Sequence, residues 1–109
     1  MDGKLNIYLD GPADAPKLLF IHGFNYFTEM YATFLNELIV SHRVLSIDLP
    51  GHGLTSAAPV YDLNAFVSAI QFALQLKQFS GFNVVGHSFG GFLALVCHSH
   101  PLVLQFNPL

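Results

Sequence analysis

A serine lies between two glycines in the segment Gly86-His87-Ser88-Phe89-Gly90, which has the spacing G-x-S-x-G. One apolar run precedes this segment and another follows it, so Ser88 is predicted to lie on a strand-to-helix turn. Such a turn strains the serine backbone and brings chain segments close together, and glycine at 86 and 90 removes the side chains that would clash. The N–H groups that begin the next helix favour developing negative charge. This pattern predicts Ser88 as a nucleophile; the alternative is a purely structural Gly-Ser turn.

A second segment, His22-Gly23-Phe24, follows the apolar run at residues 18–21. A backbone N–H at the end of such a strand is able to face the substrate of a nucleophile. The second N–H donor of an oxyanion hole is expected from Phe89, the residue after the serine.

A third segment, Asp-Leu-Pro-Gly-His-Gly at residues 48–53, forms a tight turn after the apolar run at 43–47. We interpret Asp48 as a structural residue that accepts backbone hydrogen bonds. His22 and His52, which lie in glycine turns, are expected to hydrogen-bond the backbone, and His87 is expected to point away from the serine.

Alternating strands and helices must position these segments. Strands are predicted at residues 5–9, 18–21, 43–47, 82–85 and 102–106. An amphipathic helix is predicted at 28–40, with Thr28 as its N-cap and an apolar face formed by Tyr31, Phe34, Leu35, Leu38 and Ile39. A second helix is predicted between Asp62 as N-cap and Lys77, with an apolar face formed by Leu63, Phe66, Val67, Ile70 and Leu74.

The residues at 92–97 are uniformly apolar, which favours a buried helix that ends before Pro101. Cys97 is expected to be an inert thiol of the core. Apolar strands that alternate with helices indicate an α/β fold, in which helices cover both faces of a mainly parallel sheet. Residues 1–109 are expected to form a single domain.

The composition excludes several classes of protein. Of the 109 residues, 52% are hydrophobic and 10% are charged, which excludes a disordered chain. The net charge of -3 argues against nucleic acid as a partner, and a single cysteine excludes a disulfide scaffold. Neither a phosphate-binding G-x-x-x-x-G-K-[ST] nor a G-x-G-x-x-G after a strand is present. Without a membrane span or signal peptide pattern, a cytoplasmic protein is the default expectation.

Taken in order, the three segments at 22–24, 48–53 and 86–91 resemble the N-terminal part of the α/β-hydrolase fold family, whose members carry a Ser-His-Asp triad. The run Gly-His-Ser-x-Gly-Gly is similar to that of small esterases, C–C bond hydrolases and proline iminopeptidase-like enzymes. The resemblance implies Ser88 as nucleophile and the N–H groups of Phe24 and Phe89 as the oxyanion hole, supported by turns at Gly23, Gly86 and Gly90. It implies no metal or organic cofactor. Phe24, Phe27 and Phe89 would line a pocket for a small apolar ester, amide or ketone.

The chain departs from that family after Ser88. The family order is serine, acid and histidine, yet no Asp or Glu follows Asp62, and Asn107 stands near the place where some members carry the acid. His98 and His100 are expected roughly 15 Å from Ser88 along a helix, too far for a base. Their spacing also allows a two-ligand metal fragment, which lacks a third ligand.

We therefore expect the family's last strands, last helices and triad partners to be missing, and this chain alone to be inactive. The alternative is a non-catalytic remnant that acts by self-association through an uncovered edge of its sheet.

Overall fold

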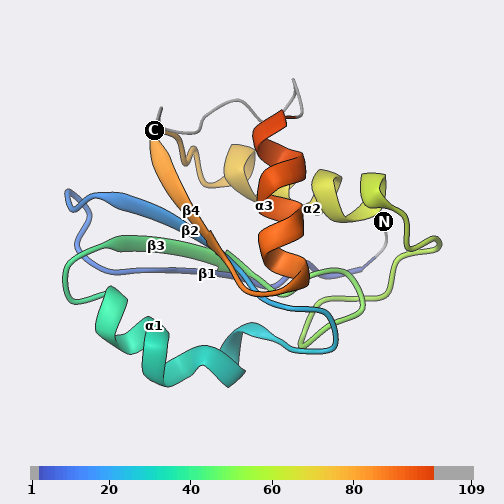
Figure 1. Ribbon diagram of the computed structural model, residues 1–109, viewed down its shortest axis with the longest axis horizontal. Helices are drawn as coiled ribbons and strands as arrows, with labels where there is room; N and C mark the ends of the chain where they lie inside the picture. Colours follow the sequence, from blue (N-terminus) through green and yellow to red (C-terminus); the bar gives the residue numbers. More distant parts are fainter. Residues whose placement is uncertain (1–2, 100–109) are drawn as a thin grey trace.

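The computed structural model describes residues 3–99, in which strands and helices alternate along the chain (Figure 1). The strands are β1 (Ile7–Asp10), β2 (Lys17–Ile21), β3 (Arg43–Ile47) and β4 (Phe82–Gly86). The helices are a short 3-10 helix η1 (Thr28–Tyr31), α1 (Ala32–Leu38), α2 (Leu63–Leu76) and α3 (Phe89–Ser99). The strand predicted at 102–106 and the helix stop at Pro101 lie outside the described residues.

The four strands form one sheet in the order β1-β3-β2-β4. β2 pairs in parallel with both β3 and β4, whereas β1 pairs antiparallel with β3 at the edge. The predicted mainly parallel sheet is therefore confirmed. Ile21 pairs with Ile47 on one side and with Gly86 on the other, so the three parallel strands end level. The three segments with candidate functional residues follow directly after these strand ends.

Helices cover both faces of the sheet, with α1 on one side and α2 and α3 on the other (Figure 1). The reason lies in the alternation of side chains along a strand. Leu19 and Ile21 of β2 join the larger core with α2 and α3, while Leu18 and Phe20 join the smaller core beneath α1. Apolar residues at successive positions therefore serve two cores, as expected for a strand buried on both faces.

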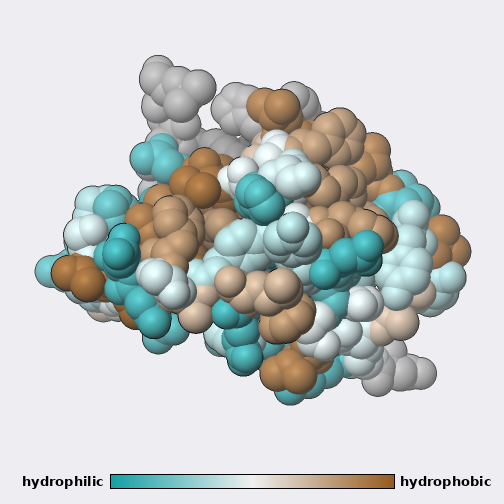
Figure 2. Space-filling model, turned by 60° about the horizontal axis from the view of Figure 1, so that its bottom comes forward, coloured by the Kyte–Doolittle hydropathy of each residue, from teal (hydrophilic) through white to brown (hydrophobic). Residues whose placement is uncertain are grey.

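The segment predicted as one helix at 28–40 begins as η1 and becomes α1 only at Ala32. The prediction that Thr28 caps the helix was wrong, because its hydroxyl donates to the carbonyl of Ile47 and its N–H donates to Asp48. These bonds attach Thr28 to the end of β3. No residue of α1 is fully buried, and apolar and polar side chains are interspersed on the surface that Figure 2 brings forward.

The predicted cap of α2 is confirmed, since the Asp62 carboxylate accepts the N–H of Ala65 at 2.9 Å. Lys77 lies at the C-cap, and most of the predicted apolar face is buried. Leu63 is the exception, because it lies in the first turn and is 45% exposed. Ala73, which was not predicted on this face, is fully buried.

The prediction of a buried helix at 92–97 is correct for only part of the helix surface. Leu93 and Cys97 are fully buried, whereas Phe92 and Leu95 are 49% and 70% exposed. Residues four apart share one face of a helix, so the sheet covers the stripe with Leu93 and Cys97. Within residues 3–99, no helix has both the length and the apolarity needed to cross a membrane.

Candidate active site

Ser88 lies in a sharp turn between β4, which ends at Gly86, and α3, which begins at Phe89. Its φ is 57°, in the left-handed region that non-glycine residues rarely adopt. The side chain is exposed, and the carbonyl of Ser88 accepts the N–H of Phe92 at 3.2 Å. An exposed serine is thus held in a strained conformation at the N-terminus of a helix, the geometry typical of an activated nucleophile.

Gly86 and Gly90 lie where backbone segments meet. A Cβ at Gly86 would overlap the carbonyl of Gly90, on the other side of the turn. A Cβ at Gly90 would overlap the carbonyl of Ile21 and lie 2.6 Å from the carbonyl oxygen of His22. The turn around Ser88 therefore packs directly against the end of β2, and the N–H of His87 binds the carbonyl of Ile21 at 3.1 Å.

The loop after β2 presents one N–H group that no acceptor within residues 3–99 binds. The N–H of Gly23 donates to the Tyr31 hydroxyl and the N–H of Asn25 donates to His52, each at 3.0 Å. Between them, the N–H of Phe24 makes no hydrogen bond to any of residues 3–99.

A second N–H group without an acceptor in the described residues lies beside the serine, at Phe89. The N–H of Gly90 donates to the carbonyl of His87 at 2.9 Å, but no acceptor in the described part of the chain binds the N–H of Phe89. The rings of Phe24 and Phe89 meet edge to face with centroids 5.8 Å apart, so the two residues are neighbours. Both predicted oxyanion donors therefore lack an acceptor within residues 3–99, and they belong to residues whose side chains are in contact.

Tyr31 connects the two segments, a role that the sequence did not reveal. Its hydroxyl accepts the N–H of Gly23 and forms a hydrogen bond with Nδ1 of His87 at 2.8 Å. As predicted, His87 is directed to this tyrosine, and its ring also packs against Tyr26 with centroids 5.6 Å apart. The helical spacing of Tyr31 indicated only an apolar face, and no sequence signal distinguished its hydroxyl.

His22 and His52 each bind backbone groups through both ring nitrogens, so the predicted backbone hydrogen bonds of these histidines are confirmed. Nδ1 of His22 donates to the carbonyl of Gly23 at 2.7 Å, and its Nε2 accepts the N–H of Leu49 at 2.9 Å. Nδ1 of His52 donates to the carbonyl of Pro50, and its Nε2 accepts the N–H of Asn25. Burial lowers the pKa of His22 below its ordinary value, so the neutral ring that this pattern requires is favoured.

Asp48 is a buried structural carboxylate, as predicted. It is 1% exposed and accepts the N–H groups of Thr28 and Leu54 and the side-chain amide of Asn6. Burial raises the pKa of Asp48, but these hydrogen bonds outweigh burial and hold the pKa below its ordinary value. The carboxylate therefore joins three segments instead of facing Ser88.

The described residues place no general base beside Ser88. Both ring nitrogens of His22 and of His52 are already bound. α3 continues to Ser99, so its rise of about 1.5 Å per residue separates the backbone of His98 from Ser88 by about 15 Å along the axis. His100 and Asn107 lie outside the described residues.

Neither a reactive thiol nor a metal centre is present in the described part of the chain. Cys97 is fully buried, and burial raises the pKa of its thiol to about 11, as expected for an inert core residue. No group of three or more His, Cys, Asp or Glu within residues 3–99 is arranged to hold a metal ion.

Comparison with known proteins identifies chains that are similar to this one over most of its length. A model of the Alpha/beta hydrolase family matches residues 18–104. The chain is 30% identical over 95 residues to a "Serine hydrolase-like protein" of Danio rerio, covering 84% of this chain and 29% of that protein. It is 28% identical over 90 residues to a "Pimeloyl-[acyl-carrier protein] methyl ester esterase" of Chromobacterium violaceum, covering 83% of this chain and 34% of that protein.

A similar solved structure is a hydrolase from Pseudomonas aeruginosa PA01. Its TM-score to this chain is 0.86 at 26% identity, and the match covers 95% of this chain and 39% of the solved one. The chain thus spans 29% to 39% of the length of these three proteins, which are more than twice as long.

Proposed function

The chain belongs to the alpha/beta hydrolase family, and on this basis we propose that Ser88 is the nucleophile of a serine hydrolase. The observation that carries the proposal is the left-handed backbone of an exposed serine at a helix N-terminus, with a φ of 57°. A structural Gly-Ser turn has no need to hold a serine in this conformation. The proposed reaction is hydrolysis of an ester, amide or C–C bond through an acyl-enzyme.

In this reaction the hydroxyl oxygen of Ser88 forms a bond to the substrate carbonyl carbon and transfers its proton to a base. The carbonyl oxygen becomes an oxyanion, which accepts the N–H groups of Phe24 and Phe89. Their lack of protein acceptors among the described residues supports this role. The leaving group then departs with the proton from the base, and water hydrolyses the acyl-enzyme by the same steps.

We propose that the base is a histidine outside residues 3–99, because the described histidines are engaged or distant. The acid that would orient this base is absent after Asp62 in the sequence. A serine without a base is a weak nucleophile. We therefore expect the 109-residue chain alone to have at most the residual acceleration of an oxyanion hole, about 10³–10⁴ over water in a studied protease.

The substrate is proposed to be a small apolar ester, amide or ketone. Phe24 and Phe27 are 52% and 38% exposed, and Phe24 packs against the ring of Phe89 beside the serine. These rings would contact an apolar acyl group. An ester is also the substrate class in the name of the similar Chromobacterium violaceum esterase.

A fluorophosphonate probe tests the nucleophile directly. We expect slow, saturable labelling at Ser88 in the native chain, located by peptide mass spectrometry, and no labelling of Ser88→Ala. Ser56→Ala is the matched control, because it removes a serine hydroxyl in the loop that binds the N-terminal segment at Lys4. Labelling that persists in Ser88→Ala would overturn the nucleophile. Labelling at the rate of a complete serine hydrolase would overturn the inactivity of the isolated chain.

The second candidate function is association without catalysis. β4 lies at an edge of the described sheet, and the apolar side chains of Phe92 and Leu95 are exposed on the adjacent helix α3. An open sheet edge and an apolar helix face both favour pairing with another chain. Size-exclusion chromatography with light scattering discriminates, because a monodisperse monomer at high concentration contradicts this candidate.

A further inference from the structure

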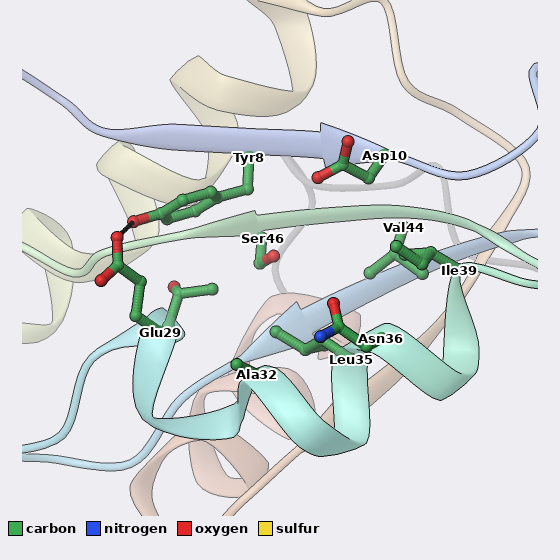
Figure 3. A pocket seen from close by; sticks show the side chains of 10 residues that line it. Tyr8, Asp10, Glu29, Ala32, Leu35, Asn36, Ile39, Val44 and Ser46 are labelled. Atoms are coloured by element: carbon green, nitrogen blue, oxygen red, sulfur yellow. Dashed lines mark hydrogen bonds between the residues drawn. The ribbon is translucent and has the colours of Figure 1, made fainter.

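A small cavity of about 170 Å³ lies between β1, β3 and α1 (Figure 3). Among its polar side chains, Tyr8 donates to Oε1 of Glu29 at 3.2 Å. Within residues 3–99, every buried side-chain nitrogen and oxygen has a hydrogen-bond partner. The side chains of this cavity are therefore satisfied by the fold, in contrast to the backbone N–H of Phe24 in the loop after β2.

Phe24 lies in a tight turn whose closing hydrogen bond leaves two other N–H groups without a partner in the turn. The N–H of Tyr26 donates to the carbonyl of Gly23 at 3.1 Å, so Phe24 and Asn25 are the central residues of a β-turn. Asn25 has a φ of 65°, a left-handed conformation that asparagine tolerates better than most residues. Groups outside the turn therefore determine how the N–H groups of Phe24 and Asn25 are used.

His52, in the turn after β3, binds one of these two N–H groups. Its Nε2 accepts the N–H of Asn25 at 3.0 Å. Its Nδ1 lies 2.9 Å from the carbonyl of Pro50, which can only accept, so the ring is neutral with its proton on Nδ1. The ring also meets the ring of Phe24 edge to face, with centroids 5.2 Å apart. His52 therefore contacts Phe24 and holds the peptide group that follows it.

The peptide group that precedes Phe24 is held at its carbonyl. This carbonyl, of Gly23, accepts the N–H of Tyr26 and also Nδ1 of His22, the latter at 2.7 Å. In a trans peptide the N–H points opposite to the carbonyl, so these bonds direct the N–H of Phe24 away from the ring of His22. With both of its peptide groups held, the backbone of Phe24 is oriented before a substrate binds.

Another histidine already joins the two loops, so the distinctive feature of the His52 bond is its place next to Phe24. His22, in the loop after β2, accepts the N–H of Leu49 in the turn after β3 at 2.9 Å. The main chain of His52 is fixed within its own turn, because its N–H donates to Leu49 and its carbonyl accepts the N–H of Thr55. A buried ring on a fixed backbone thus reaches across to the residue that follows Phe24.

We propose that His52 is a positioning residue for hydrolysis, because it holds the backbone of Phe24 in the arrangement in which its N–H binds an oxyanion. The proposal rests on the proposed function, in which Phe24 is one of the two oxyanion donors. Without the acceptor at Nε2, the central peptide of the turn can rotate, since Asn25 would gain a negative φ that suits any L-residue. The backbone of Phe24 would then sample several arrangements, and a preorganised donor would be lost.

Two amide substitutions at His52 separate the acceptor from the rest of the ring. Glutamine reaches the place of Nε2 with an acceptor oxygen, whereas asparagine is one methylene shorter and reaches only the place of Nδ1. We expect fluorophosphonate labelling of Ser88 to be about fivefold to tenfold slower in His52→Asn, a part of the roughly 10²–10³ that loss of a whole oxyanion donor costs. His52→Gln should restore most of the native rate.

Amide hydrogen exchange tests the hydrogen bond without any reaction at Ser88. The N–H of Asn25 should exchange faster in His52→Asn than in the native chain or in His52→Gln. His42→Asn and His42→Gln are the matched controls, because the ring of His42 contacts only the Ser41 hydroxyl among the described hydrogen bonds. Both should leave labelling and exchange unchanged, and all rates are compared at a temperature where the variants remain folded.

The native chain provides a test that does not depend on the folding of any variant. Nitrogen-15 shifts of the His52 ring should place its proton on Nδ1, and a proton on Nε2 would exclude the acceptor and overturn the proposal.

The labelling outcomes distinguish this proposal from the proposed function. Equal labelling rates in His52→Asn and His52→Gln would refute the positioning role and leave Ser88 as the nucleophile, as would equal slowing in His42→Asn. Absence of labelling in the native chain, with the exchange difference at Asn25 still present, would instead overturn the nucleophile and with it the reaction for which His52 positions Phe24.

Discussion

Two turns at the same edge of the sheet contain a histidine between or beside glycines, yet they use their polar groups in opposite ways. In the loop after β3, the carboxylate of Asp48 and both ring nitrogens of His52 bind other groups of the fold. In the turn after β4, Ser88 is exposed and strained, and the N–H of Phe89 binds no acceptor among the described residues. Satisfied and buried polar groups are typical of a structural turn, whereas a strained serine beside an N–H without an acceptor supports the proposed role of the turn after β4.

A side chain at Gly90 should disrupt the strained turn and cause the greatest loss of stability. In Gly90→Ala the new Cβ would overlap the carbonyl of Ile21, so the turn and the end of β2 must separate. We expect the free energy of unfolding to fall by more than about 3 kcal/mol, as for other severe steric conflicts. Urea denaturation followed by circular dichroism measures the loss.

Gly91→Ala is the control for that substitution. Its Cβ would lie 3.3 Å from the carbonyl oxygen of Gly86, which requires only a small adjustment, and alanine favours a helix by about 1 kcal/mol over glycine. Equal destabilisation by the two variants would contradict the steric role of Gly90.

The second greatest loss of stability is expected from a change in the satisfied turn after β3. Asp48→Ala removes the acceptor for the N–H groups of Thr28 and Leu54 and for the Asn6 amide. Because hydrogen bonds to a charged group are worth about 1.5–3 kcal/mol, we expect a loss of about 3 kcal/mol in unfolding free energy. The exposed Asp14→Ala provides the comparison by the same denaturation, and an equally small change in both variants would contradict a structural Asp48.

A pH dependence tests the contacts of the satisfied turn after β3, because Nε2 of His22 accepts the N–H of Leu49 in that turn. The pKa of His22 is lowered by burial, so the unfolded chain binds this proton more tightly than the folded chain. Stability should therefore be complete above about pH 6.5 and fall as the pH decreases from there through the folded pKa, by at most about 1.4 kcal/mol per pH unit. Denaturation midpoints between pH 7.5 and pH 5 measure this slope, and His22→Gln should reduce it.

The matched variant for this prediction is His42→Gln, whose ring contacts only the neighbouring Ser41 hydroxyl among the described hydrogen bonds. It should leave the slope unchanged. An unaltered slope in His22→Gln would show that the buried ring of His22 is not the group that titrates.

The sequence predicted most of what depends on local pattern. The three parallel strands, the Asp62 cap and the two glycines of the strained turn follow from alternation, capping and steric rules that act over a few residues. The prediction for Thr28 failed because its hydrogen bonds go to Ile47 and Asp48 on a distant strand, and these override the local preference for a cap.

Tertiary contacts also explain what the sequence could not reveal at the candidate site. The apolar residues of α3 indicated a buried helix, but the fraction that the sheet covers depends on which stripe faces it. The hydroxyl of Tyr31 was invisible for the same reason, since its partners Gly23 and His87 are brought to it by the crossovers of the sheet. A periodicity argument identifies a buried face but not the polar atom at the end of a half-buried tyrosine.

Tyr31 joins the loop after β2 to the strained turn, and removal of its hydroxyl should cost less stability than the changes above. Tyr31→Phe keeps the ring, which packs against Phe20 with centroids 4.8 Å apart, and removes the hydroxyl that binds Gly23 and His87. We expect a loss of about 1 kcal/mol in unfolding free energy, typical of a neutral hydrogen bond. Tyr26→Phe is the matched control, because its ring contacts Tyr31 and His87 but its hydroxyl makes no hydrogen bond among residues 3–99.

If the bridge also positions the unused N–H of Phe24 relative to Phe89, Tyr31→Phe should slow fluorophosphonate labelling of Ser88 by more than its effect on stability explains. Labelling at a temperature where both variants remain folded separates the two contributions, since a purely structural bond changes only the folded fraction. A labelling rate in Tyr31→Phe equal to that in Tyr26→Phe would restrict the tyrosine to stability. The strained turn and the loop after β2 would then hold their geometry through the backbone contacts that His87 and Gly90 make with the end of β2.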